Sequence, residues 1–178
     1  MKNVEITKLI NQQNWHLLIS NYTPDDICNA LSFQKAMRLA NNLFYEHLED
    51  GAIQQFAVDL AFKIREHFKD QWNMDWKNDV FLGHLCSIIW RYDDQYECYK
   101  RAFNTLKDPP DSLLLLLAGS NNVPGNPLIT LQESEEYLKR ALEKKVTYEA
   151  ALMMRALYKH KGERELEGYW DHMCETLK

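Results

Sequence analysis

The sequence predicts an all-α protein, built as a superhelical stack of antiparallel helical hairpins. Apolar residues recur three and four positions apart along almost the whole chain, as expected for helices with one buried face. Only six glycines and five prolines interrupt the 178 residues, and capping residues begin several of the periodic segments. A seven-residue motif also recurs in the second half of the chain, which indicates repeated helical pairs.

The first part of the chain contains five expected helices. Two short ones cover about 4–11 and 14–20, and a third begins at Pro24, because Thr23 can cap it and two aspartates follow in its first turn. A single apolar stripe runs from Phe33 to Leu48 and is expected to end at Asp50-Gly51. The segment 53–68 is apolar around most of its circumference, so we expect it to be the central element.

A polar connection, 69–77, leads to a helical hairpin. Asn78 is expected to cap a helix over 78–91, and a second helix follows over 94–106. Pro109-Pro110 then stops the hairpin, and a short apolar helix begins at Asp111 or Ser112 and continues through Leu117. The stretch 119–127 is the one clear loop.

Three further helices complete the predicted set. Thr130 and Glu133 form a capping-box pattern for a helix that ends near Lys145. Thr147 begins another helix, which ends at Lys161-Gly162. The last helix covers 163–177.

An internal repeat relates two of these helices. The run 97–103, ECYKRAF, matches the run 136–142, EYLKRAL, at a spacing of 39 residues. A second helix follows each copy, and repeats of this length are typical of α-solenoids, whose helical pairs bury their apolar faces by stacking on their neighbours. Ala102 and Ala141 occupy the positions where two helices must approach closely.

The stretch from about Tyr92 to Lys178 resembles the Sel1-like branch of the tetratricopeptide-type repeats. The resemblance is carried by the run 137–142, by Ala150-Ala151, and by Leu157-Tyr158 followed by Gly162, although the usual Leu-Gly pair before the tyrosine is replaced by Ala156-Leu157. The resemblance implies protein binding or scaffolding through a curved helical face, and it does not imply catalysis. We therefore expect an N-terminal helical cap, 1–77, and Sel1-like repeats, 78–178, that together form one compact unit.

Composition narrows the classes of partner. The formal net charge is −5, which opposes non-specific binding to nucleic acid or to anionic membranes. The longest apolar run, Leu113–Ala118, is too short to cross a bilayer, and no secretory signal is visible at the start. The four cysteines, at 28, 86, 98 and 174, show no disulfide or CxxC spacing. We expect a cytoplasmic protein with reduced thiols and no cofactor.

The densest unusual cluster is the run 90–96, WRYDDQY, at the expected hairpin turn. In one interpretation Trp90, Arg91, Tyr92 and Tyr96 are interface anchors, since tryptophan, tyrosine and arginine dominate binding energies. In the other, the aromatic residues pack the hairpin, while Asp93 and Asp94 cap its second helix. A catalytic role for the two aspartates is disfavoured, because neighbouring side chains on a turn diverge.

A second aromatic pair, Trp72 and Trp76, flanks the expected boundary. If exposed, the two rings would form a partner-binding patch. Otherwise they seal the junction between the cap and the repeats.

A metal site is not predicted. His84 and Cys86 project in different directions from one helix, and with Cys98 they do not complete a set of four zinc ligands. No metalloprotease, nucleophile-elbow or phosphate-loop motif occurs in the sequence.

These observations predict a non-catalytic module that binds a single protein partner. Proteins that resemble this family include adaptors and immunity proteins that neutralise a toxin. The acidic groups, if they converge, favour a toxin or another basic protein as the partner. The alternative is an enzyme of unfamiliar all-α fold, in which His47, His67 or His84 converges with two carboxylates in a cleft between the two halves.

Overall fold

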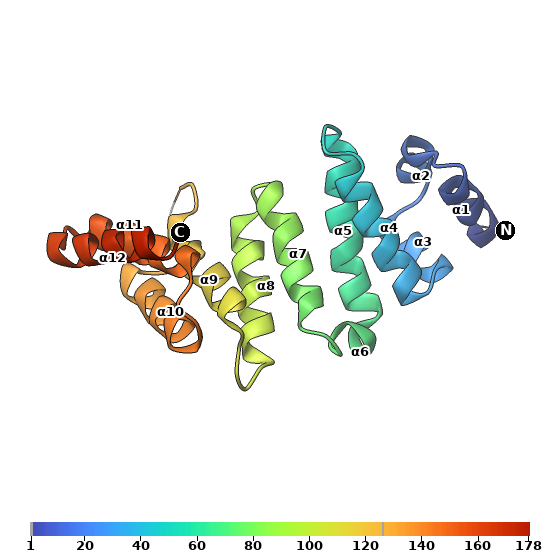
Figure 1. Ribbon diagram of the computed structural model, residues 1–178. Helices are drawn as coiled ribbons and strands as arrows, with labels where there is room; N and C mark the ends of the chain where they lie inside the picture. Colours follow the sequence, from blue (N-terminus) through green and yellow to red (C-terminus); the bar gives the residue numbers. More distant parts are fainter. Residues whose placement is uncertain (1, 126) are drawn as a thin grey trace. The chain divides into compact units, whose positions relative to one another are not determined.

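The computed structural model describes residues 2–125 and 127–178, and these residues form helices without any strand. The chain divides into two compact units, Met1–Arg91 and Tyr92–Lys178, and Figure 1 shows the helices of each. The all-α prediction is confirmed. Among the described residues, no helix combines the length and the apolar character that a membrane crossing requires.

The first unit contains seven of these helices. They are α1 (Lys2–Asn11), α2 (Trp15–Asn21), α3 (Pro24–Ala30), α4 (Phe33–Tyr45), α5 (Gly51–His67), α6 (Lys69–Trp72) and α7 (Lys77–Ile88). Helix α5 contacts α2, α3, α4, α6 and α7, and its residues from Ile53 to Ile64 bury more than one face. It is therefore the central element of this unit, as its apolar circumference predicts.

Local capping explains where two of these helices begin. Thr23 Oγ1 accepts a hydrogen bond from the Asp26 amide at 3.2 Å, and the Asp26 carboxylate accepts one from the Thr23 amide, so the expected start of α3 is confirmed. Asp50 was expected to end a helix, but its carboxylate caps the start of α5 by accepting from the amides of Ala52 and Ile53. The preceding helix already ends at Tyr45.

The segment 69–77 was expected to be a connection, but it contains the short helix α6. Trp72 in this helix is fully buried, and its indole Nε1 donates to the Asp79 carboxylate at 2.9 Å. Asn78 does not cap α7, which begins one residue earlier. Instead, the Asn78 side-chain amide donates to the carbonyl oxygen of Trp72 at 2.9 Å, so Asn78 ties α7 to α6.

The described residues of the second unit form five α-helices and one short 3₁₀ helix. They are α8 (Tyr92–Asn104), α9 (Asp111–Gly119), η1 (Ser120–Asn122), α10 (Leu131–Lys144), α11 (Tyr148–Lys161) and α12 (Arg164–Thr176). Each α-helix packs on the next one along the chain, from α8 to α12.

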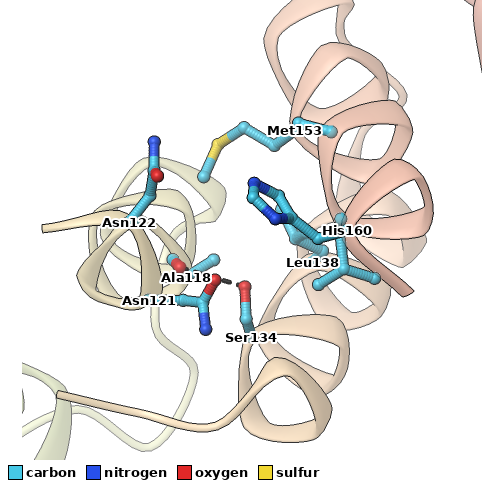
Figure 2. Close-up of a pocket in the computed structure, with 10 residues that line it drawn as sticks. Ala118, Asn121, Asn122, Ser134, Leu138, Met153 and His160 are labelled. Atoms are coloured by element: carbon cyan, nitrogen blue, oxygen red, sulfur yellow. Dashed lines mark hydrogen bonds between the residues drawn. The ribbon is translucent and has the colours of Figure 1, made fainter. Parts of the chain in front are cut away.

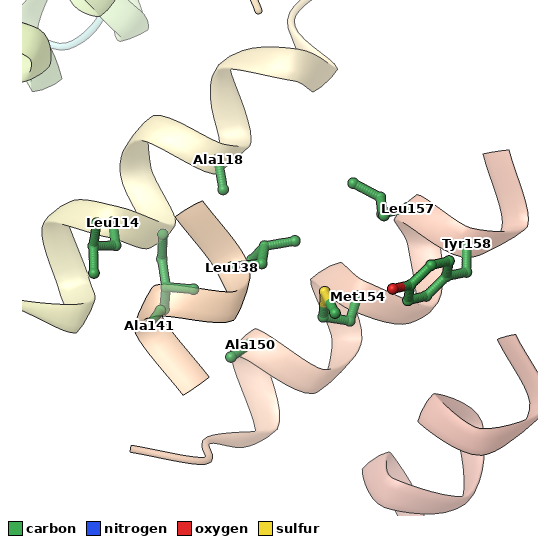
Figure 3. Close-up of a cluster of buried hydrophobic side chains, with 9 residues drawn as sticks. Leu114, Ala118, Leu138, Ala141, Ala150, Met154, Leu157 and Tyr158 are labelled. Carbon is green, nitrogen blue, oxygen red and sulfur yellow. The ribbon is translucent and has the colours of Figure 1, made fainter. Parts of the chain in front are cut away.

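The core of the second unit lies between α9, α10 and α11 (Figure 3). Small side chains, Ala118, Ala141 and Ala150, lie there among larger ones such as Leu138 and Tyr158. Because alanine has a short side chain, the three helices can approach closely while the larger residues fill the remaining space.

The capping predictions for the second unit are confirmed. Thr130 and Glu133 form the expected capping box at α10, and the Thr147 hydroxyl accepts from the Ala150 amide at the start of α11. Within the expected loop 119–127, residues 120–122 form η1, and Asn126 lies outside the described residues.

Candidate partner-binding surface

Helix α7 ends in a turn whose central residue, Trp90, has a left-handed backbone with φ of 66°. Two hydrogen bonds close the turn: the Arg91 amide donates to the Cys86 carbonyl at 2.9 Å, and the Trp90 amide donates to the Ser87 carbonyl at 3.3 Å. Helices often end in this way, but the left-handed position usually holds glycine. A left-handed backbone costs a residue with a Cβ atom about 1–2 kcal/mol.

The same turn ends α11, and there it contains glycine. The Glu163 amide donates to the Tyr158 carbonyl at 3.0 Å, the Gly162 amide donates to the Lys159 carbonyl at 3.2 Å, and Gly162 has φ of 75°. The chain therefore uses glycine in one turn and tryptophan in a turn with the same hydrogen bonds.

The strain at Trp90 is not offset by burial, because 79% of the residue's surface is exposed. Residues that are held in a strained backbone conformation concentrate at functional sites. The exposed ring of Trp90 is thus the most unusual feature of the first unit.

Arg91, beside Trp90, is held against α5. Its guanidinium lies 4.7 Å from the centre of the Phe62 ring, and its Nη1 lies 3.4 Å from Oδ1 of Asp59. Ile88, on the other side of Trp90, is 44% exposed. We call Ile88, Trp90 and Arg91 the α7 turn surface.

The structure divides the predicted cluster 90–96 between the two units. Trp90 and Arg91 end the first unit, whereas Tyr92, Asp93, Asp94 and Tyr96 lie in the first two turns of α8. The two aspartates occupy the end of α8 that favours negative charge.

The two remaining candidates, Trp72 and Trp76, differ in their exposure. Trp76 is partly buried and directly precedes α7. Trp72 is fully buried, so its proposed role as a surface anchor is wrong: the indole joins α6 to α7 through Asp79.

A second surface of aromatic and cationic side chains lies where α8 meets α10. The Phe103 and Tyr137 rings pack edge to face, with centres 5.6 Å apart, and the Arg140 guanidinium lies 5.0 Å from the centre of the Phe103 ring. On α8, the Lys100 ammonium lies 5.2 Å from the centre of the Tyr96 ring. We call these five residues the α8–α10 cluster.

The pKa values of two groups in the α8–α10 cluster, Lys100 and Tyr137, are raised. Hydrogen bonding and electrostatic attraction to Tyr96 raise the pKa of Lys100, and burial raises the pKa of the Tyr137 phenol. The lysine therefore stays protonated and the Tyr137 phenol stays neutral at physiological pH. Among these five residues, only Tyr96 was a candidate in the sequence. The signal for the two cations was the repeated Lys-Arg pair, whose first copy contains Lys100 and whose second copy contains Arg140.

The histidines of the alternative enzyme hypothesis all lie in the first unit. His47 lines a hollow formed by the residues 45–50, together with Glu46, Glu49 and Asp50. Its Nε2 is buried and has no hydrogen-bond partner among the described residues, so no carboxylate orients that nitrogen. Burial lowers the pKa of His84 on α7, and His67 packs edge to face against Phe68.

The remaining candidate groups are the cysteines and the possible metal ligands. All four cysteines are buried. Burial raises the pKa of Cys28 to about 11, which makes this thiol a poor nucleophile. Within residues 2–125 and 127–178, no three His, Cys, Asp or Glu side chains come together as a metal ion would require.

Comparison with known proteins identifies no family. No family model matches the sequence, and neither the curated proteins nor the solved structures yield a match. The geometry of the α7 turn surface and the α8–α10 cluster is therefore the basis for the function proposed below.

Proposed function

We propose that this chain is a non-catalytic recognition module that binds a single protein partner, with Trp90 as its main anchor. The observation that supports this function best is an exposed tryptophan in a left-handed turn. The equivalent turn at Gly162 shows that the chain can use glycine in this position.

A comparison of two free energies, the backbone strain of Trp90 and the burial of its ring by a partner, supports its role as an anchor. The left-handed backbone destabilises the free protein by about 1–2 kcal/mol. A partner that covered the exposed part of the indole would gain about 3–5 kcal/mol from hydrophobic burial before the costs of association, at about 25 cal/mol for each Å² removed from water. Hydrophobic burial thus more than offsets the strain, and Arg91 beside the indole is already held in place by Phe62 and Asp59.

We further propose that the helical pairs of the second unit stack as a Sel1-like α-solenoid, and that the α8–α10 cluster is a second contact for the partner. Consecutive packing from α8 to α12 supports the stacking. Tyrosine and arginine, which are enriched among the residues that dominate binding energy, support the contact role of Tyr137 and Arg140.

The net charge of −5 favours a basic partner such as a toxin, because opposite charges accelerate association. An inhibitor or immunity protein would suppress the activity of the captured partner, whereas an adaptor would leave that activity intact. An activity assay on the purified complex separates these two roles.

Affinity capture from the native source tests the recognition function. The tagged full-length protein and two variants, Trp90→Gly and Gln13→Gly, serve as baits. Gln13 is a matched control, because it also has a left-handed backbone, with φ of 53°, in a turn of the first unit.

We expect the unchanged protein and Gln13→Gly to retain one stoichiometric partner. Trp90→Gly should retain at least roughly tenfold less, as the loss of a dominant anchor implies. Equal recovery with all three baits would show that Trp90 is not the anchor.

A further inference from the structure

A pocket of about 180 Å³ opens in the second unit, between the C-terminal ends of α9 and α11 and the first half of α10. Small and apolar residues line most of its wall, and polar residues line the rest. Figure 2 shows the Met153 and His160 side chains extending from α11 toward Ala118 and Asn122.

The polar groups of the pocket are partly committed within the fold. The Ser134 hydroxyl donates to the Ala118 carbonyl at 3.0 Å, which closes one side of the pocket. The Asn121 side-chain nitrogen donates to the Ile129 carbonyl at 3.2 Å, so its side-chain oxygen is the atom that can accept from a ligand. Asn122 and His160 are exposed at the rim.

The lining restricts the chemistry of the ligand. Among the described residues, no lysine, arginine, aspartate or glutamate lines this pocket, and its histidine, His160, lies exposed at the rim. A charged group deep inside the pocket would therefore lose hydration without gaining an ion pair. The ligand must therefore be uncharged where it enters.

The size of the pocket restricts the ligand further. A cavity of about 150 Å³ can hold a benzene ring, so the volume of about 180 Å³ suits one aliphatic or aromatic side chain. The residues at the mouth are small: Ala156 is exposed, and a Cβ atom added to Gly119 would lie 3.8 Å from Met153 Cε.

We propose that this pocket receives one uncharged apolar side chain from a peptide segment of the partner. The carboxamides of Asn121 and Asn122 can both donate and accept, which suits the backbone amides on either side of that residue. This inference rests on the proposed recognition function and names the chemistry of one contact.

An NMR titration of the full-length protein tests the pocket with three probes. N-acetyl-leucinamide is the neutral apolar probe, N-acetyl-aspartic acid α-amide carries a carboxylate on its side chain, and N-acetyl-lysinamide carries an ammonium group on its side chain. We expect the neutral probe to cause saturable shifts of the amide signals of residues 118–122 and 153–160 at millimolar concentration. Each charged probe should bind at least roughly tenfold more weakly, because of its desolvation cost.

Variants connect those shifts to the pocket. Ala156→Leu fills the mouth and should abolish the shifts, and Asn122→Ala should weaken binding several-fold. Ala52→Leu, at an exposed alanine of α5, is the matched control and should leave binding unchanged. Circular dichroism verifies that each variant is folded.

The proposal is overturned if the neutral probe causes no saturable shift, if a charged probe binds equally well, or if folded Ala156→Leu still binds. These results are distinct from a failure of the recognition function. If the probe does not bind but capture still depends on Trp90, only the pocket proposal fails. If the probe binds but capture does not depend on Trp90, the function assigned to the α7 turn surface fails.

Discussion

Replacing Trp90 by glycine should stabilise the protein, although it removes a large aromatic side chain. Glycine releases the left-handed strain of about 1–2 kcal/mol. Glycine also has more conformational freedom in the unfolded chain, and this lowers the gain in the free energy of unfolding by about 0.5–1 kcal/mol. Because Trp90 is 79% exposed, little packing is lost. The net gain is therefore about 0.5–1 kcal/mol, or a rise in Tm of roughly 1–4 °C for a chain of this size.

Urea denaturation followed by circular dichroism at 222 nm measures this effect, since that signal does not depend on the number of tryptophans. The midpoint should rise for Trp90→Gly while the m-value stays constant. Trp90→Ala keeps the Cβ atom and the strain, so it should lie within about 0.5 kcal/mol of the unchanged protein.

The reciprocal change, Gly162→Ala, introduces that strain but also removes glycine's freedom in the unfolded chain, so it should destabilise the second unit by about 0.5–1 kcal/mol. If Trp90→Gly is no more stable than Trp90→Ala, the backbone of Trp90 is not strained.

Two further predictions concern the interior and the pH dependence of the fold. Asp79→Ala leaves the buried Trp72 indole without its acceptor and should lower the free energy of unfolding by about 1–3 kcal/mol. Asp79→Asn keeps an acceptor oxygen and should cost less. Equal losses for the two variants in urea melts would refute the role of Asp79 as the acceptor. Lys139 and Lys161 lower the pKa of Glu135 from 4.5 to about 2. Because the folded pKa is the lower one, this contribution is complete above about pH 4.5 and is lost as the pH falls toward 2. Urea melts between pH 2 and 6 should therefore show a weaker pH dependence for Glu135→Gln, and an unchanged dependence would contradict the role of this carboxylate.

The helix starts that depend on local contacts could be predicted from the sequence. Thr23 and Asp26, like Thr130 and Glu133, lie three residues apart, and their hydrogen bonds close within a single turn. The central position of α5 was also predictable, because its apolar residues cover most of the helix circumference.

Roles that depend on distant packing could not be predicted in this way. Asp50-Gly51 fits the end of one helix as well as the start of the next, and only the fold selects the start. Asn78 is a good capping residue by type, but the position of α6 directs its side chain to the Trp72 carbonyl instead.

The candidate site was predictable in residue type but not in geometry. The sequence identifies Trp90 as an unusual residue, yet a tryptophan gives no signal of a left-handed backbone, which normally indicates glycine. Phe103 and Tyr137 are far apart in sequence, so their contact between α8 and α10 emerges only from the tertiary structure.

The affinity of the captured partner for Trp90→Gly, measured by titration calorimetry beside Gln13→Gly, tests the anchor role of Trp90 most directly. We expect a dissociation constant at least roughly tenfold higher for Trp90→Gly, since an anchor residue is lost. We expect an unchanged constant for Gln13→Gly, in which only backbone strain is released. Equal affinities for the two variants would contradict the claim that the strained, exposed tryptophan exists to bind a partner.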